Sequence, residues 1–195
     1  MRKDLGEKPL IYPQPVLLVG TYDADGVPNL MTAAWGCVWG FKEVEINLSI
    51  DHKTSQNIRL HKAFTLSMAT QDVITAADYV GLVSGKKVVD KIEQAGFHDE
   101  PAVHVYAPLF RELPLTLECK VLTMYQNEKK DDFRVVGEVV NASVDESVLD
   151  ENGVIDPAKL KAVSYAPDGH YYVLCAEKVG HAFQDGKALI KKQGS

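Results

Sequence analysis

The sequence predicts a mainly β fold: a closed antiparallel barrel with helices in the connections between strands. Apolar stretches of moderate length, some alternating and some continuous, recur along the chain and are separated by turn-forming residues. Helical patterns occur between some of these stretches without regular strand–helix alternation, which disfavours a doubly wound parallel sheet. Many antiparallel strands of this length lose their exposed edges when the sheet closes into a barrel.

Turn chemistry and side-chain period define the elements of the first third. Asp23-Ala24-Asp25-Gly26 is a turn sequence between two apolar runs and predicts a hairpin. Val44, Ile46 and Leu48 alternate with polar residues, the period of a half-buried strand. A polar stretch without Gly or Pro then predicts a helix over residues 54–62. The expected strands cover residues 15–22, 29–35, 44–50 and 63–69.

The remainder is expected to begin with helices and end with strands. Two long β-rich stretches, residues 115–125 and 133–144, are joined by a charged tip over residues 126–132, the pattern of an antiparallel hairpin. The other expected elements are helices over residues 71–80 and 88–95, one helical turn over residues 157–162 and a last strand over residues 171–183.

Length and charge limit the class of protein. A chain of 195 residues, 46% hydrophobic and 25% charged, is expected to form a single domain over residues 1–195. A net charge of −6 disfavours nucleic acid as a partner. The apolar run over residues 16–19 is too short for a signal peptide or a membrane span. Cys37, Cys119 and Cys175 form no disulfide or zinc pattern, so we expect a cytoplasmic protein with reduced thiols, and Cys119 as a small buried residue.

The common nucleotide and hydrolase motifs are missing. No GxGxxG follows a strand, and the segment Gly81–Lys87 has neither the spacing nor the Ser/Thr of a P-loop. The sequence also has no GxSxG or HExxH. His98-Asp99-Glu100 with His104 offers metal-ligand chemistry, but Pro101 interrupts the group and a polar loop is the favoured interpretation, so we predict no metal.

The strand over residues 29–35 is the first candidate ligand surface. Thr32, Ala33 and Ala34 are small enough for a flat ligand to approach the backbone closely. Asn29 and Thr32 offer side-chain hydrogen bonds. The alternative is a strand that merely has small residues.

The segment over residues 49–57 is the second candidate. Lys53, Thr54 and Ser55 lie where a strand ends and a helix begins, and free N–H groups with the positive end of the helix dipole bind phosphate there. The alternative is that Thr54 or Ser55 is an ordinary N-cap. His52 by itself is expected to be a surface histidine and not a catalytic base.

Taken together, these segments resemble the flavin reductase-like, FMN-binding split-barrel family, which includes flavoredoxins. The resemblance rests on order and spacing over nearly the whole chain, and it implies an antiparallel Greek-key split β-barrel with helices in the crossover connections. The matching pieces are Asn29-Leu-Met-Thr-Ala-Ala, His52-Lys-Thr-Ser-Gln-Asn-Ile, Val83-Ser-Gly-Lys, Asp90-Lys, Ala95-Gly, Leu117-Glu-Cys and Val179-Gly-His-Ala-Phe.

The resemblance also implies a set of cofactor-binding residues. The strand over residues 29–35 would line the isoalloxazine, and residues 49–54 would hold the ribityl chain and phosphate, with charge from Lys53. Lys91 would reach the flavin or its phosphate, and Tyr165 would pack near the ring. His52 and Asp51 stand where well-known members have Arg or a second Ser. The implied residues are Asn29, Met31, Thr32, Ala33, Ala34, Trp35, Ser49, Ile50, Asp51, His52, Lys53, Thr54, Asn57, Lys91 and Tyr165.

The implied function is that of an FMN-binding flavin reductase or flavoredoxin-like oxidoreductase. Electrons would come from NADH or NADPH, or from a redox-protein partner, and pass through bound FMN. Hydride transfer to a flavin needs no protein acid or base, so no catalytic residue is predicted. His181 could approach the flavin, but an exposed histidine is the favoured interpretation. Family members are typically homodimers with FMN near the interface. The alternative function is a non-enzymatic FMN electron carrier or flavin-dependent sensor.

Overall fold

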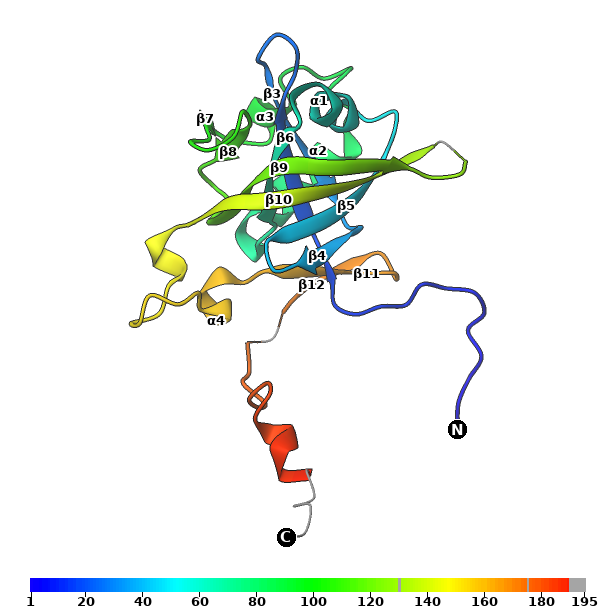
Figure 1. The fold of residues 1–195 in the computed structure, drawn as a ribbon, viewed down its shortest axis with the longest axis vertical. Helices are drawn as coiled ribbons and strands as arrows, with labels where there is room; N and C mark the ends of the chain where they lie inside the picture. Colours follow the sequence, from blue (N-terminus) through cyan, green and yellow to red (C-terminus); the bar gives the residue numbers. More distant parts are fainter. Residues whose placement is uncertain (130, 175, 190–195) are drawn as a thin grey trace.

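A seven-stranded antiparallel sheet dominates the computed structural model, which describes residues 1–129, 131–174 and 176–189 (Figure 1). The fold is mainly β, with short helices in the connections, as the sequence predicts. In order across the sheet the strands are β3 (Pro28–Ala33), β2 (Leu17–Tyr22), β6 (Ala63–Met68), β9 (Leu115–Gln126), β10 (Asp132–Val144), β5 (Glu43–Ser49) and β4 (Gly36–Gly40).

The two ends of this sheet are neighbours in the sequence. β3 and β4 are its edge strands, yet only Ala34 and Trp35 separate them. The sheet therefore curls until its edges approach, and the Asn47 N–H donates to the Trp35 carbonyl oxygen at 2.8 Å. β3 has β2 as its only ladder partner in the described sheet, so the barrel stays split between β3 and β5. This split positions the candidate site.

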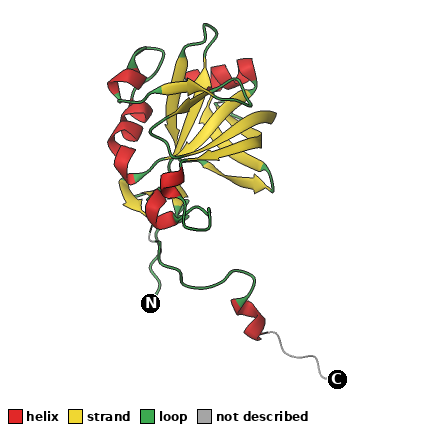
Figure 2. Cartoon of the chain, turned by 90° about the vertical axis from the view of Figure 1, so that its left-hand side faces the viewer, coloured by secondary structure: helices red, strands yellow, loops and turns green. Residues whose placement is uncertain are grey.

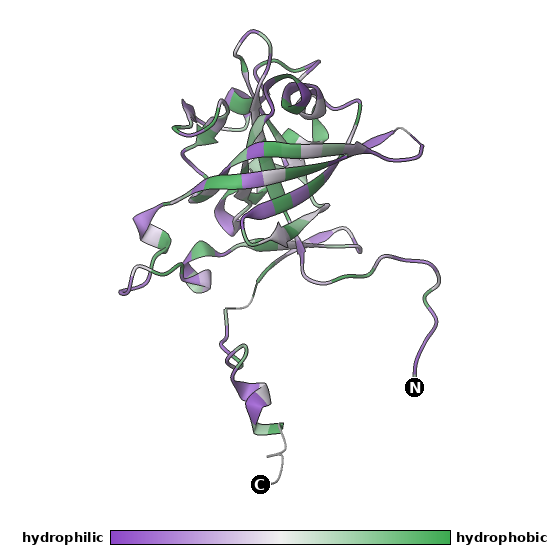
Figure 3. Ribbon diagram, in the orientation of Figure 1, coloured by the Kyte–Doolittle hydropathy of each residue, from purple (hydrophilic) through white to green (hydrophobic). Residues whose placement is uncertain are grey.

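The interior of the barrel holds the main apolar core. Val44, Ile46 and Leu48 of β5 are all buried, so the alternation predicted from the sequence is confirmed. They pack in one cluster with Phe64 of β6 and Val135 of β10. Hydropathy alternates along these strands in Figure 3. Burial of one face per strand fixes the strand register, because a slip by one residue would turn these side chains outward.

A second core lies between the sheet and its covering helices (Figure 2). β2 serves both cores, since Leu17 and Val19 face the barrel interior while Leu18 packs with Ala77 and Val80. The main helices are α1 (Lys53–His61), α2 (Ile74–Leu82) and α3 (Lys91–Gln94). Among the described residues, no helix is long and apolar enough to cross a membrane.

The remaining elements are short. They form a three-stranded sheet, a two-stranded ribbon and single helical turns. They are β1 (Gln14–Pro15), β11 (Val163–Ala166), β12 (His170–Val173), β7 (Asp99–Pro101), β8 (Pro108–Phe110), α4 (Pro157–Leu160), η1 (Gln71–Val73), η2 (Glu146–Val148) and η3 (Asp185–Leu189).

The strand predicted over residues 171–183 is wrong over most of its length. β12 ends at Val173, and no strand follows among the described residues up to 189. The reason is that β11, the partner of β12, begins at Val163, which pairs with Val173, so the described residues after Val173 have no strand to pair with. β4, β7, β8 and β11 were not predicted, and the helix expected over residues 88–95 is limited to α3. Cys175 lies outside the described residues.

Candidate functional site

Two adjoining cavities follow β3 along the split. The larger, of about 310 Å³, lies between residues 31–35 and the facing strands β5 and β10. The smaller, of about 210 Å³, lies between the start of α1 and the loop over residues 81–85. Met31, Thr32 and His52 line both cavities, so they form one continuous groove. A ligand that occupies both cavities would be elongated along β3.

Lys91 is a buried cation on the wall of the smaller cavity. Its exposed fraction is 3%, and its ammonium donates to the carbonyl oxygens of Val80 at 3.1 Å and Val83 at 3.3 Å. Burial, with a smaller contribution from nearby Lys53, lowers the pKa of Lys91 to about 8. No carboxylate in the described part of the chain forms an ion pair with Lys91. A buried ammonium without a counter-ion, beside an open cavity, favours an anionic ligand.

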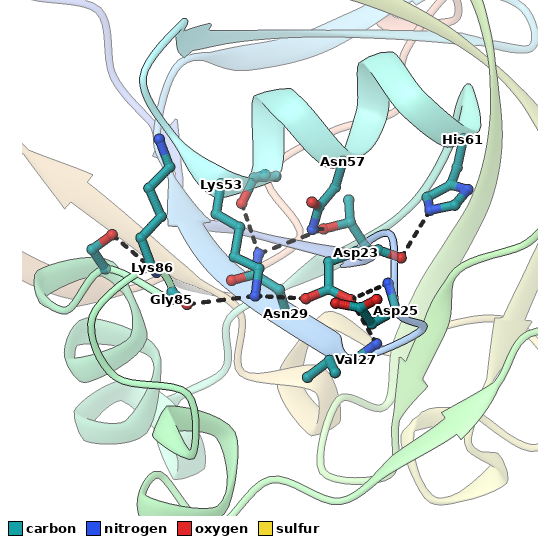
Figure 4. A network of polar contacts seen from close by, with 12 residues as sticks. Asp23, Asp25, Val27, Asn29, Lys53, Asn57, His61, Gly85 and Lys86 are labelled. Atoms are coloured by element: carbon teal, nitrogen blue, oxygen red, sulfur yellow. Dashed lines mark hydrogen bonds and ion pairs between the residues drawn. The ribbon is translucent and has the colours of Figure 1, made fainter.

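Lys53 begins α1 and is already paired with a carboxylate. Its ammonium lies 2.8 Å from Asp23 Oδ2 and 3.5 Å from the Gly85 carbonyl oxygen (Figure 4). Burial opposes ionisation of Asp23, but hydrogen bonds from Lys53 and from backbone N–H groups keep its pKa below the ordinary value. Lys53 therefore brings less uncompensated charge to the cavity than Lys91 does.

The N-terminus of α1 has no side-chain cap. His52 is the N-cap residue and makes no side-chain capping hydrogen bond. Burial lowers the pKa of His52 and so favours its neutral imidazole. The N-cap alternative for Thr54 and Ser55 is wrong, because both lie inside the helix. Ser55 Oγ donates to the Ser49 carbonyl oxygen at 2.6 Å and ties the helix to the end of β5.

The polar side chains of β3 serve the scaffold. Asn29 is buried and its Nδ2 donates to Thr54 Oγ1 at 2.9 Å, which fixes α1 against the strand. Thr32 Oγ1 donates to the Ala77 carbonyl oxygen of α2. Both side chains therefore have internal partners, and the strand offers a ligand mainly its backbone and small side chains.

Gly85 lets the loop approach this scaffold closely. A Cβ at Gly85 would lie 2.4 Å from Asn29 Oδ1 and 3.5 Å from Lys91 Cε. A side chain at this position would therefore displace the amide or narrow the space beside the lysine.

Most of the residues implied by the family resemblance line the groove, and four do not. Asn57 is buried and donates to Thr21 Oγ1 at 3.0 Å, and Tyr165 packs against the second core. Ile50 packs against the barrel core, and the Asp51 carbonyl oxygen accepts from Lys86 Nζ at 2.5 Å. The residues on the groove walls are Asn29, Met31, Thr32, Ala33, Ala34, Trp35, Ser49, His52, Lys53, Thr54 and Lys91.

Several lining residues were absent from the candidate set. The glycines at 81 and 85 were a local signal for close packing, since a Cβ at these positions would meet the side chains of Thr32 and Asn29. The signal for Asn47 and Asp132 is not local, because only the curling of the sheet brings β5 and β10 opposite β3. The residues missed are Asn47, Leu48, Gly81, Leu82, Val83, Ser84, Gly85 and Asp132.

The other histidines have separate partners. His98 Nδ1 lies 2.6 Å from Glu112 Oε1, and His104 Nδ1 lies 3.0 Å from Glu118 Oε1. Within the described ranges, no group of three His, Cys, Asp or Glu side chains is arranged to hold a metal ion. His181 is exposed in the C-terminal segment and does not line the groove.

Comparison with known proteins agrees with this architecture. Flavoredoxin of Desulfovibrio vulgaris (Miyazaki F) is 34% identical, with a TM-score of 0.89 over 95% of this chain and 100% of that chain. Flavoredoxin from Methanosarcina acetivorans is 26% identical, with a TM-score of 0.86 over 97% and 100%. A protein with a split barrel domain from Shewanella frigidimarina, 21% identical, shares the fold with a TM-score of 0.76 over 86% and 84%.

The family assignment covers most of the chain. Residues 10–169 match the model of the flavin reductase like domain, a span that contains every residue lining the two cavities. With the split-barrel architecture and the flavoredoxin relatives, this match shows that the chain belongs to the flavin reductase-like domain family.

Proposed function

We propose that this protein binds FMN in the groove along β3 and acts as a flavin reductase or flavoredoxin-like oxidoreductase. The observation that carries the proposal is Lys91, a buried ammonium with no carboxylate partner in the described chain, on the wall of a cavity beside a helix N-terminus. Such a position suits a phosphate. The larger cavity next to it, lined by small residues of β3, suits a flat ring.

The residues present fit FMN from one end to the other. Lys91, the α1 N-terminus and the loop at Gly85 would hold the phosphate. Ser49 and His52 would border the ribityl chain, and residues 31–35 would lie along the isoalloxazine. Bound FMN supplies hydride and electron transfer. The chain's own residues bind the cofactor, orient it and keep water from one side of it.

The electron donor is proposed to be NADH or NADPH, or a redox-protein partner. The described chain has no dinucleotide-binding α/β unit, so recognition of a nicotinamide nucleotide would be shallow, with KM toward the upper part of the usual range of roughly 1 μM to 1 mM. The alternative, an FMN electron carrier or flavin-dependent sensor, requires the same groove. Anaerobic mixing of the FMN-loaded protein with NADH or NADPH separates the two, since bleaching of the flavin band identifies a reductase.

A homodimer with FMN near its interface is part of the proposal. Large apolar side chains are exposed on β4 and β9, among them Trp39, Leu122 and Tyr125. Asn47 lines both the larger groove cavity and an outer cavity of about 560 Å³ that Trp39 and Tyr125 also line. A second copy on this face would cover apolar area next to the open side of the groove.

FMN titration is the direct test. Purified protein is titrated with FMN and, in parallel, with riboflavin, and binding is followed by flavin fluorescence. Tighter binding of FMN than of riboflavin supports a phosphate site at Lys91. Absence of FMN binding would contradict the proposed function.

A further inference from the structure

We propose that the C-terminal tail of one chain packs against a second copy of this chain, so that two copies exchange their tails reciprocally. This inference rests on the homodimer proposed above and names a segment that stabilises it. β12 ends at Val173, and the described chain continues to Leu189. In Figures 1 and 2 this continuation lies away from the barrel, on the same side as the N-terminal arm.

The tail carries large apolar side chains that contact no core. Val179 is 91% exposed, Phe183 is 94% exposed and Leu189 is 86% exposed. Scattered exposed apolar residues are ordinary, but here three occur within eleven residues that project from the body. Burial of these groups on another surface would be favourable, and Phe183 offers the largest area.

The tail also has a defined local shape. We call residues 179–189 the hook. The His181 N–H donates to Asp185 Oδ2 at 2.8 Å, and the Gln184 and Asp185 N–H groups donate to the His181 carbonyl oxygen at 3.2 Å. Phe183, between them, has a φ of 61°, which is uncommon for a residue with a bulky side chain. The hook is therefore a turn closed by its own hydrogen bonds, with Phe183 exposed within it.

An apolar cavity at the same end of the molecule matches the hook. It has a volume of about 190 Å³, and Pro15 of β1, which pairs with Ser164 of β11, is part of its lining. Cys37 and Val38 on the edge strand β4 are exposed, so the cavity is open at that edge. Its lining carries no charged side chain and consists of Pro15, Leu17, Gly36, Cys37, Val38, Val44, Leu66, Ser67, Met68, Leu115 and Leu117.

The geometry favours exchange between copies. The Leu174 N–H donates to the Ala162 carbonyl oxygen at 2.9 Å, which fixes where the tail leaves the body. In the described residues, the hydrogen bonds of the hook are all internal to it. Because hook and cavity lie at one end, a two-fold axis near that end presents each hook to the other copy's cavity. Exchange of an identical element is a common route to a symmetric dimer.

A disulfide trap between two different full-length chains tests the exchange. The first chain carries Phe183→Cys and Cys37→Ser, and the second keeps Cys37 and Phe183; Cys175→Ser is present in both. Cys119 is buried, and burial raises the pKa of its thiol to about 12, so it does not compete. The chains are mixed and oxidised with diamide, which takes up the two electrons and two protons of the thiol pair. The expected product is a covalent heterodimer on a non-reducing gel.

The matched control carries Val154→Cys in place of Phe183→Cys. Val154 is also exposed and lies outside the hook, so it should give little heterodimer. Equal yields with Phe183→Cys and with Val154→Cys, or no heterodimer with Phe183→Cys, would overturn the exchange. An intrachain disulfide in a single chain carrying both Cys37 and Phe183→Cys would overturn it too, because the hook would then occupy its own cavity.

A second measurement needs no cross-link. Phe183→Asp should raise the dimer dissociation constant in sedimentation experiments by roughly 10- to 100-fold, from loss of a buried aromatic side chain. Val154→Asp should leave it unchanged. If Phe183→Asp leaves a dimer that still binds FMN and has an unchanged dissociation constant, the proposed contact of the hook with the other copy is refuted and the proposed function stands. A chain that gives the heterodimer but binds no FMN supports the tail exchange and contradicts the proposed function.

Discussion

At the scale of single residues, Lys91 is expected to dominate recognition of the FMN phosphate. Lys91→Met removes a charge-assisted contact worth about 1.5–3 kcal/mol, so FMN affinity should fall roughly 10- to 100-fold. Riboflavin, which lacks the phosphate, should bind within about twofold of wild type. Lys53→Met should cost FMN less, because Asp23 already pairs with that ammonium at 2.8 Å. Parallel fluorescence titrations with both ligands measure this, and equal losses for FMN and riboflavin would refute a phosphate contact.

The lowered pKa of Lys91, about 8, predicts how FMN binding depends on pH. A bound phosphate favours the charged ammonium and so raises the pKa of Lys91 in the complex. Above pH 8 binding must then take up a proton, and the apparent Kd should rise by up to about tenfold per pH unit. Riboflavin binding and the Lys91→Met variant should lack this rise between pH 8 and 9.5. An FMN affinity that stays constant over that range would contradict the assignment.

Gly85 is a position where any side chain should damage the site. In Gly85→Ala the new Cβ would meet Asn29 Oδ1, whose amide is held by Thr54. We expect a lower melting temperature and weaker FMN binding, since strain of this kind costs about 1–3 kcal/mol. Gly186→Ala is the control, because nothing lies within 4 Å of its added Cβ. Thermal unfolding with and without FMN measures both effects, and a Gly85→Ala protein that matches the control would be evidence against close packing here.

The sequence indicated which residues line the site better than it indicated which groups their side chains bond. Lys91 and Lys53 were both named as candidates, and both line the smaller cavity. Nothing in the local sequence indicated that Asp23, in a turn 30 residues earlier, pairs with Lys53. Thr32 and Asn29 were expected to bond a ligand, yet their side chains bond Ala77 and Thr54. Such pairings depend on tertiary contacts that side-chain patterns do not encode.

At the scale of elements, the packing of the β9–β10 hairpin depends on Gly137, which has no side chain. Gly137→Ala would place a Cβ 2.6 Å from the Phe64 ring in the barrel core, at a register shift between β10 and β9. Overpacking there should lower the free energy of unfolding by about 1–3 kcal/mol. Because Gly137 lies outside both groove cavities, the folded variant should keep its FMN affinity. Denaturant unfolding and FMN titration separate these effects, and an unchanged midpoint would contradict the packing argument.

Elements were predictable where one periodic pattern described them. β5 alternates Val44, Ile46 and Leu48 inward, and the period-2 pattern located it to within one residue at each end. β4, by contrast, has exposed apolar residues and neighbours a glycine, so no burial pattern marks it. The expected strand over residues 171–183 is wrong beyond Val173 because the next residues have strand-like composition but, among those that the structure describes, no partner strand. Pairing, which defines a strand, is a property of the fold.

At the scale of the whole molecule, closure of the sheet creates the groove. The chain passes from one sheet edge to the other within two residues, Ala34 and Trp35, so the split between β3 and β5 follows from connectivity. The walls of the groove therefore come from β3 on one side and from β5 and β10 on the other, with helix α1 and the loop at Gly85 at one end. Trp39 and Tyr125 are exposed and line an outer cavity that shares Asn47 with the groove.

This juxtaposition predicts that assembly and cofactor binding are coupled. The expected species is a symmetric dimer at micromolar concentration in sedimentation velocity, with the outer face at Trp39 in its interface. Trp39→Asp would remove a large apolar side chain from the proposed interface and add a carboxylate to a cavity that Glu45 and Glu128 also line, so it should shift the protein toward monomer and lower FMN affinity together. Val154→Asp, exposed and outside both cavities, should change neither. Sedimentation with parallel FMN titration checks the coupling, and a monomeric Trp39→Asp protein that binds FMN as tightly as wild type would show that the groove is complete within one chain.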